Sequence, residues 1–319
     1  MNSSTRPELL CIVGPTGSGK SNLAINIALE LAKSGIKAEI VNADSMQFYK
    51  GMDIGTAKVP VDERFGIKHH MLDWLEIAEE NTAARYQIEA RKVISDLRAE
   101  GTLPIVVGGS MLYIAALINT FEFPGRDEAL RAQLEQDLID FGPVAMHKRL
   151  ELLDETAASR IEPQNGRRIV RALEIVMITG EPFAASLPDQ FESFLPVLEI
   201  GLNSAREHLV ERLAERVRGM WALGLVDEVR SLESKGIRDS KTASQAIGYS
   251  QALASIDGRL TEEEAIAETT LLTQRYARRQ MSWFRRDPRI NWFDYQDENL
   301  LEEVMSLVRT SLQLPGKVG

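Results

Sequence analysis

The stretch Gly14-Pro15-Thr16-Gly17-Ser18-Gly19-Lys20-Ser21 matches the phosphate-loop pattern G-x-x-x-x-G-K-[ST] at every required position. Glycines let backbone N–H groups turn toward phosphate oxygens, the lysine reaches two phosphates, and the final hydroxyl ligates Mg²⁺. Before the loop, residues 9–13 are continuously apolar and predict a buried strand; after it, Leu23, Ile27 and Leu31 recur with helical spacing. We therefore predict an α/β core that binds a di- or triphosphate. A dinucleotide-binding turn is disfavoured because G-x-G-x-x-G is not present in this stretch.

The composition is that of a globular protein, with 319 residues, 44% hydrophobic content and a formal net charge of −10. This length suggests about two domains. No apolar run approaches the roughly 18 residues of a membrane span, and the first residues show no signal pattern, so we expect a cytoplasmic protein without a membrane partner. The single cysteine, Cys11, excludes an internal disulfide framework. The acidic balance argues against a nucleic-acid partner in general, but arginines gather near residues 167–171 and 275–289 and allow a local basic surface.

Polar residues follow two further apolar strands. Residues 38–43 predict a strand that runs into Asp44, and residues 103–107 predict one that ends in Gly108-Gly109-Ser110. Ligands bind at the carboxyl edge of open parallel sheets, so Asp44, Ser110 and the phosphate loop should face one crevice. Residues 46–58 fit neither a helix nor a strand period and are interpreted as an active-site loop.

A helical block interrupts the strands. Residues 127–141, 143–153 and 166–179 predict helices, and a strand resumes at 196–202. We therefore predict a P-loop NTPase-like parallel sheet core flanked by helices, formed by residues 1–125 and 196–319, with an all-helical insertion domain at 126–195. After the strand the remaining chain is expected to be helical, at 204–219, 225–234 and about 262–286.

Several stretches beyond the phosphate loop occur in the order found in tRNA dimethylallyltransferases. They are Asp44-Ser45-Met46-Gln47 with Gly51–Lys58, Gly108–Tyr113, Arg160–Glu174, Ala246–Tyr249 and Tyr276–Gln280. The chain resembles a bacterial member of this family over nearly its whole length. The resemblance implies transfer of a dimethylallyl group from dimethylallyl diphosphate to the exocyclic 6-amino group of the adenosine 3′ of the anticodon in tRNA, with release of diphosphate.

The resemblance also implies catalytic roles. Asp44 accepts the proton of the amine as the C–N bond forms, and Ser110, where the family pattern usually has Thr, acts near the reacting centre. Lys20 and the loop stabilise the leaving diphosphate with Mg²⁺ held by Ser21. Arg216 is assigned to the diphosphate, with a solvated helix residue as the alternative. The diphosphate-binding set is Gly14, Thr16, Gly17, Ser18, Gly19, Lys20, Ser21 and Arg216.

The helical block resembles the domain with which this family grips the anticodon stem. Arg167 and Arg171 are four residues apart and share a helix face, and Arg131 lies on the first helix of the block. Taken alone, each of these arginines is more often a solvated charge. The tRNA-binding set implied by the resemblance is Asp44, Ser45, Met46, Gln47, Ser110, Arg131, Arg167, Arg168, Arg171, Ile247, Gly248, Tyr249 and Arg279, on a protein expected to be a monomer.

Two other classes of function stay open at this stage. A small-molecule phosphate-loop kinase, or a relative that prenylates a free adenine nucleotide, would share the loop but would lack a second domain for tRNA. A nucleic-acid-binding switch driven by nucleotide hydrolysis would leave Asp44 beside Gln47 without an obvious role.

Overall fold

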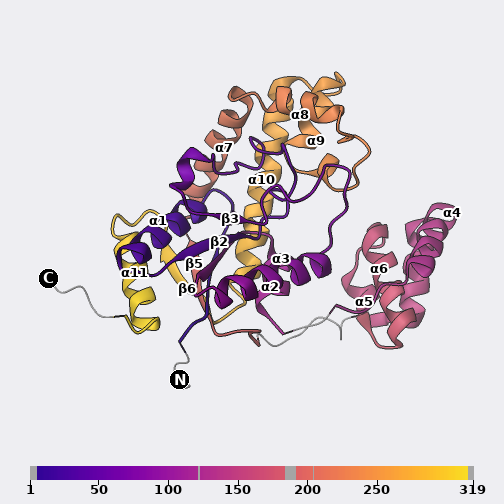
Figure 1. Ribbon diagram of the computed structural model, residues 1–319. Coiled ribbons are helices and arrows are strands. Elements are labelled where there is room, and N and C mark those ends of the chain that lie inside the picture. Colours follow the sequence, from indigo (N-terminus) through magenta and orange to yellow (C-terminus); the bar gives the residue numbers. More distant parts are fainter. Residues whose placement is uncertain (1–5, 121–122, 184–191, 204, 315–319) are drawn as a thin grey trace. The chain divides into compact units, whose positions relative to one another are not determined.

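The structure is a computed structural model that describes residues 6–120, 123–183, 192–203 and 205–314. Contacts divide the chain into two compact units, Met1–Asn119 with Ser193–Gly319, and Thr120–Glu192 (Figure 1). The second unit thus begins at residue 120, where the sequence analysis placed the boundary at 126, and ends at 192 where the analysis placed it at 195.

The first unit contains a six-stranded parallel sheet with strand order β3-β2-β4-β1-β5-β6. The central strand β1 pairs with β4 on one side and β5 on the other, so Cys11 lies opposite both Val106 and Glu199. The strands are β1 (Leu9–Val13), β2 (Ala38–Asn42), β3 (His69–His70), β4 (Leu103–Val107), β5 (Val197–Asn203) and β6 (Asn291–Asp294).

The predicted strands are confirmed to within a residue at each end, but the expectation of an entirely helical C-terminal part is wrong at β6. This edge strand has four residues, all partly or fully exposed, so its sequence carries no apolar run. It forms because β5 offers an open edge, with Gly201 opposite Trp292.

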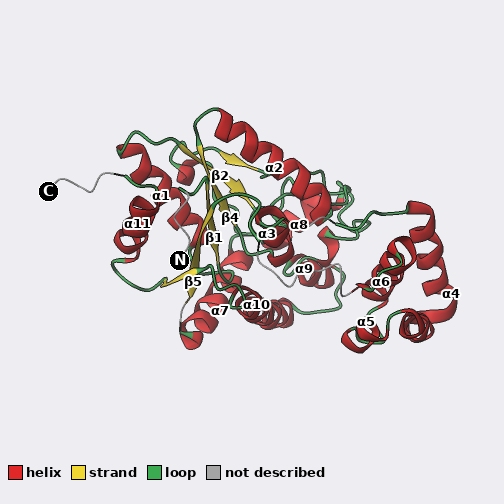
Figure 2. Ribbon diagram, turned by 90° about the horizontal axis from the view of Figure 1, so that it is seen from below, coloured by secondary structure: helices red, strands yellow, loops and turns green. Residues whose placement is uncertain are grey.

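Side chains of β1 alternate between two cores. Leu9, Cys11 and Val13 belong to one apolar cluster, and Leu10 and Ile12 to another on the opposite face. Helices α1 (Lys20–Lys33) and α11 (Leu300–Ser311) cover the second face, and α2 (Ala83–Ala99) and α3 (Met111–Ile118) the first (Figure 2). Because both faces are covered, the strand is apolar throughout. Burial raises the pKa of the Cys11 thiol, which therefore acts as a small apolar residue.

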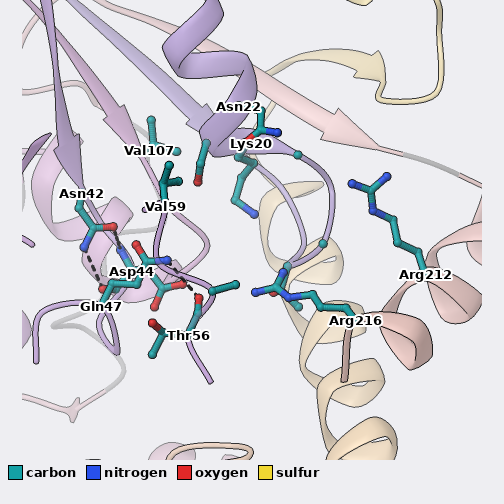
Figure 3. Close-up of a pocket in the computed structure, with 16 residues that line it drawn as sticks. Lys20, Asn22, Asn42, Asp44, Gln47, Thr56, Val59, Val107, Arg212 and Arg216 are labelled. Atoms are coloured by element: carbon teal, nitrogen blue, oxygen red, sulfur yellow. Dashed lines mark hydrogen bonds between the residues drawn. The ribbon is translucent and has the colours of Figure 1, made fainter. Parts of the chain in front are cut away.

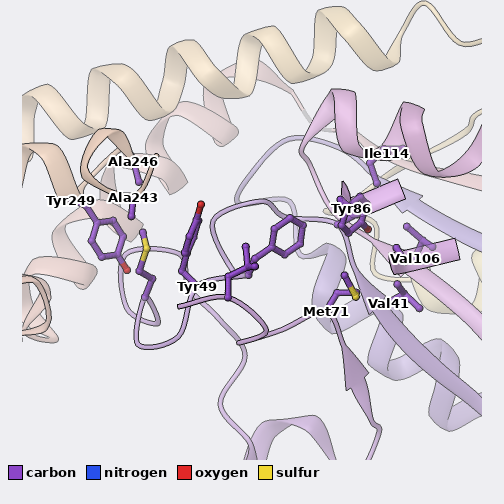
Figure 4. Packing of buried hydrophobic residues seen from close by; sticks show 14 of the residues in the cluster. Val41, Tyr49, Met71, Tyr86, Val106, Ile114, Ala243, Ala246 and Tyr249 are labelled. Carbon is purple, nitrogen blue, oxygen red and sulfur yellow. The ribbon is translucent and has the colours of Figure 1, made fainter. Parts of the chain in front are cut away.

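The first apolar cluster continues from the sheet into the C-terminal helices. Figure 4 shows it running from Val41, Val106 and Tyr86 to Ala246 and Tyr249. The helices here are α7 (Arg206–Ala222), α8 (Leu225–Glu233), α9 (Tyr249–Ile256) and α10 (Glu262–Phe284), with short 3₁₀ turns at Asp62–Arg64 and Ala243–Gln245. The sequence analysis predicted α7, α8 and α10 but not α3 and α9, which have eight residues each, nor the twelve-residue α11. Within the described ranges no helix is long and apolar enough to cross a membrane.

The second unit is helical, as predicted. Its helices are α4 (Glu128–Leu153), α5 (Glu155–Arg160) and α6 (Gly166–Thr179). Asp127 begins α4 by accepting a hydrogen bond from the N–H of Leu130 at 2.9 Å. Gly142, with φ 78° and ψ 164°, interrupts the helix and Pro143 follows, which separates the two helices predicted at 127–141 and 143–153. Gly180, with φ 70°, ends α6 where the sequence predicted it to end.

Candidate active site

The phosphate loop lies between β1 and α1, in the predicted order. Gly14 has φ 144°, and a Cβ at this position would stand 2.6 Å from the carbonyl oxygen of Leu202 on β5, so only glycine fits. Gly19, in the left-handed region with φ 79°, precedes the first turn of α1. The free N–H groups of that turn favour an anion at this end of the helix.

Cationic side chains surround the loop. Lys20 Nζ donates a hydrogen bond to the carbonyl of Pro15 at 2.7 Å, and Arg216 Nη1 donates to Thr16 Oγ1 at 3.1 Å. Arg216 therefore lies on the loop, and the alternative of a freely solvated helix residue is wrong. Burial lowers the pKa of Lys20 to about 7, the charge of Arg216 lowers it further, and Asp44 opposes both effects. An anion bound here would restore the ammonium form.

A cavity of about 340 Å³ opens in front of the loop. In Figure 3, Lys20, Arg212 and Arg216 lie on one side of it and Asp44 and Gln47 on the other. Its wall therefore presents positive charge opposite a carboxylate. The cavity is also lined by Thr56 and Ala57 of the predicted active-site loop, and by residues that the sequence did not indicate: Asn22, Asn42, Val59, Val107 and Arg212.

The carboxylate side of the cavity is built from two turns at the sheet edge. Asp44 follows β2, and its Oδ1 accepts the N–H of Met46 at 3.0 Å. Ser110, 6% exposed, accepts the N–H of Ser45 at 3.0 Å and donates to Ser45 Oγ at 3.1 Å. A Cβ on Gly108 would stand 2.5 Å from the backbone of Ala43, so the two turns touch. The predicted convergence is confirmed for Asp44 and the phosphate loop, which line one cavity, whereas Ser110 does not line it and instead holds Ser45 from behind.

A second cavity, of about 290 Å³, adjoins the first, because Thr16, Asp44, Thr56 and Arg216 line both. Asp44 thus stands where the two meet. The second cavity is additionally lined by Ser45, Met46, Gly55, Val217, Met220, Gln245, Ala246, Ile247, Tyr249, Thr269, Thr273, Tyr276 and Arg279. Of the residues predicted from the Ala246–Tyr249 and Tyr276–Gln280 stretches, Ile247, Tyr249 and Arg279 therefore reach the site, and Gly248 stands at the start of α9 with φ 93°.

Two residues of α10 that the sequence analysis quoted but gave no role connect these parts. Gln280, 1% exposed, accepts the N–H of Thr16 at 2.8 Å and donates to the carbonyl of Gly109 at 2.8 Å. One turn earlier the phenol of Tyr276 hydrogen-bonds with Ser110, and burial together with the charge of Asp44 raises its pKa to about 12. The spacing of four residues, which puts both side chains on one helix face, was the signal available in the sequence.

The arginines of the helical unit fall into two groups. Arg131 and Arg171 both donate to Glu174 Oε2, at 3.1 and 2.8 Å, and Glu174 is fully buried. Arg167 and Arg168 are exposed in the first turn of α6. All four stay predicted tRNA contacts, but Arg131 and Arg171 also hold a buried carboxylate in place.

Comparisons with known proteins identify the family of the chain. The family model described as IPP transferase matches residues 47–287. A tRNA dimethylallyltransferase of Thermobifida fusca is 52% identical over 94% of each chain, and one of Parafrankia sp. is 50% identical over 96% of each. A crystal structure of a tRNA isopentenylpyrophosphate transferase from Bacillus halodurans is 36% identical, covers 97% of both chains and has a TM-score of 0.71. A eukaryotic dimethylallyltransferase acting on tRNA is 28% identical with a TM-score of 0.79, covering 97% of this chain and 80% of its own. This chain belongs to the IPP transferase family.

Proposed function

We propose that this protein transfers a dimethylallyl group from dimethylallyl diphosphate to the exocyclic 6-amino group of the adenosine 3′ of the anticodon in tRNA, and releases diphosphate. One observation carries the proposal: the carboxylate of Asp44 stands where a cavity lined by Lys20 and Arg216 meets a second one lined by Tyr249 and Tyr276. The first offers positive charge to a diphosphate, and the second offers aromatic and apolar walls to a base and a prenyl chain. Relatives named tRNA dimethylallyltransferase support the same donor and acceptor.

The reaction needs a base at this junction. The amine nitrogen attacks C1 of the dimethylallyl group, the C1–O bond breaks, and its electron pair leaves on the diphosphate. The nitrogen then carries an extra proton, which the Asp44 carboxylate accepts. General-base assistance of this kind contributes typically about 10²–10⁴-fold to a rate. Ser110 and Tyr276 hold the turn that carries Asp44, and the Tyr276 phenol stays neutral at working pH because its pKa is about 12.

The leaving group needs positive charge that is already in place. The diphosphate draws Lys20 away from the carbonyl of Pro15, and Arg216 lies beside it on Thr16. Backbone N–H groups at the start of α1 complete the set. Groups that are in place before the C1–O bond breaks stabilise the charge that develops on the leaving oxygen, and such stabilisation is usually the largest single contribution to catalysis.

The residues present also fit Mg²⁺. No group of three or more His, Cys, Asp or Glu side chains able to hold a metal occurs in the described part of the chain, which excludes a dedicated protein cage there. Mg²⁺ is commonly held by few protein oxygens together with substrate phosphates. Ser21, at the start of α1 and on the cavity wall, would supply the hydroxyl ligand, and the ion would neutralise charge on the diphosphate.

For the tRNA we propose that exposed Arg167 and Arg168 contact backbone phosphates while Asp44 to Gln47 read the target base. The base must leave its stack to reach the second cavity. We propose that the reaction takes place in the cytoplasm, where tRNA resides. We propose that the protein acts as a monomer.

The experiment that tests the function is mass spectrometry of nucleosides from unmodified tRNA incubated with the protein, Mg²⁺ and dimethylallyl diphosphate. We expect a mass gain of one dimethylallyl group on a single adenosine, without ATP. Release of inorganic phosphate from ATP with each turnover would instead support a kinase or a nucleotide-driven switch.

A further inference from the structure

A single carboxylate outside both cavities connects two walls of the second cavity. Glu228, on α8, accepts four hydrogen bonds. Its Oε2 accepts the N–H groups of Asp53 at 3.1 Å and Ile54 at 2.7 Å; its Oε1 accepts the N–H of Gly55 at 3.4 Å and the hydroxyl of Tyr249 at 2.5 Å. An ionised carboxylate has about four lone-pair sites, so Glu228 is fully used by these donors.

The donors come from different parts of the chain. Asp53, Ile54 and Gly55 belong to the active-site loop that follows β2, and Tyr249 begins α9. Gly55 and Tyr249 both line the second cavity, whereas Glu228 lines neither cavity in the described structure. Glu228 thus joins the loop wall to the α9 wall from behind.

Packing around Gly55 shows that the two walls touch. A Cβ on Gly55 would stand 2.4 Å from the ring of Tyr249 and 2.9 Å from Leu225, which lies one turn before Glu228 on α8. Tyr249 is fully buried, and burial together with the charge of Glu228 raises the pKa of its phenol, which stays a donor. The loop is therefore seated on the aromatic ring and held there by the carboxylate.

Further hydrogen bonds connect the loop to Asp44, the proposed general base. The carbonyl of Thr56, directly after Gly55, accepts a hydrogen bond from Gln47 Nε2 at 3.1 Å. The N–H of Gln47 in turn donates to the carbonyl of Asp44 at 3.1 Å. A shift of residues 53–55 would therefore move Gln47 and the turn that carries Asp44.

We infer that Glu228 is a positioning residue for the acceptor base, setting the separation of the loop and Tyr249 so that the target amine meets Asp44. This inference rests on the proposed function of the second cavity as the site of the base. It assigns Glu228 no contact with either substrate. Its effect should fall on the transfer step with tRNA and leave binding of the diphosphate donor unchanged.

The test compares Glu228→Gln with Asp227→Asn, a matched control on the same turn. Asp227 is 80% exposed and pairs with Arg230 on its own helix. Glutamine keeps the size of Glu228 but replaces one carboxylate oxygen by an NH2 group, which cannot accept the backbone N–H bonds made at that oxygen. We expect the single-turnover rate at saturating tRNA and dimethylallyl diphosphate to fall on the order of 10²-fold, the cost of misplacing reacting groups by about 1 Å. The KM for tRNA and the Kd for dimethylallyl thiodiphosphate without tRNA should stay within about twofold, since phosphate contacts elsewhere set both affinities.

A second variant keeps the test decisive if Glu228→Gln folds poorly. Tyr249→Phe removes one donor and leaves the ring in place, and we expect a smaller loss of rate with donor affinity unchanged. In the double variant with Glu228→Gln, the loss of rate should hardly exceed that of Glu228→Gln alone, because both substitutions remove the same connection. Three results would overturn the inference. The first is a transfer rate of Glu228→Gln equal to that of Asp227→Asn, and the second is a loss of rate in the double variant equal to the sum of the two single losses in free energy. The third is a loss of affinity for the donor analogue as large as the loss of rate. If the protein without substitutions transfers no dimethylallyl group to tRNA, the proposed function is overturned instead.

Discussion

The side chain of Gln280 accepts the N–H of Thr16, 264 residues away in the sequence, at 2.8 Å. The same amide donates to the carbonyl of Gly109 at 2.8 Å. It therefore joins the phosphate loop to the turn that precedes Ser110. This bridge fixes the phosphate loop against the Gly108–Ser110 turn.

Replacing Gln280 by Met should keep the volume and leave the Thr16 N–H and the Gly109 carbonyl without partners. Each unsatisfied buried group costs about 1–3 kcal/mol, so we expect a clear loss of stability and a slower transfer step. Urea unfolding and single-turnover rates measure the two effects. Gln274→Met, on the same helix but with one bond of 3.3 Å to Val210, is the control and should change little. Equal stability of the two variants would contradict the bridge.

Asp44→Asn should remove the base and keep the fold, because asparagine retains an oxygen that can accept the Met46 N–H. The transfer rate is expected to fall by about 10²–10⁴-fold with tRNA affinity almost unchanged. Single-turnover kinetics at saturating substrates give the rate, and a binding titration gives the affinity. A rate within a few-fold of the original would exclude Asp44 as the base.

Binding of dimethylallyl diphosphate should weaken as the pH rises above about 7, where free Lys20 loses its proton. The bound anion favours the charged lysine, so binding takes up a proton above this pH, and Kd should rise by up to about tenfold per pH unit. Titrations from pH 6 to 9 measure this slope. Lys20→Arg keeps its charge throughout and should give a flat profile above pH 7, even if its affinity is lower. If Kd changes with pH in the same way for Lys20→Arg and for the original protein, a group other than Lys20 titrates.

The two groups of arginines in the helical unit should respond differently to replacement. Arg167→Ala with Arg168→Ala should leave stability unchanged and reduce the salt dependence of tRNA binding by about one unit of slope for each lost phosphate contact. Arg131→Ala should instead destabilise the unit, because buried Glu174 loses one of its two cations. Binding across a salt series and thermal unfolding separate the two outcomes. Identical salt slopes would place the tRNA elsewhere, such as along residues 275–289.

The sequence by itself determined the sheet core and one side of the site. The phosphate loop is a local motif that its own glycines, lysine and hydroxyl identify, although Gly14 also has to fit against Leu202 on β5. Apolar runs of five residues predicted β1 and β4 because these strands are buried on both faces. Asp44 followed from the rule that ligands bind at the carboxyl edge of a parallel sheet.

Only the tertiary structure decided which distant residues complete the site. Gln280 meets Thr16, and Glu228 meets Gly55, across separations of 264 and 173 residues that no periodicity records. The pairing of Arg131 and Arg171 with Glu174 was likewise hidden, since a charged residue in a helix is ordinarily solvated. Hydrogen bonds and ion pairs form between whichever groups the fold brings within about 3 Å, and that proximity is a property of the packed chain and not of its local sequence.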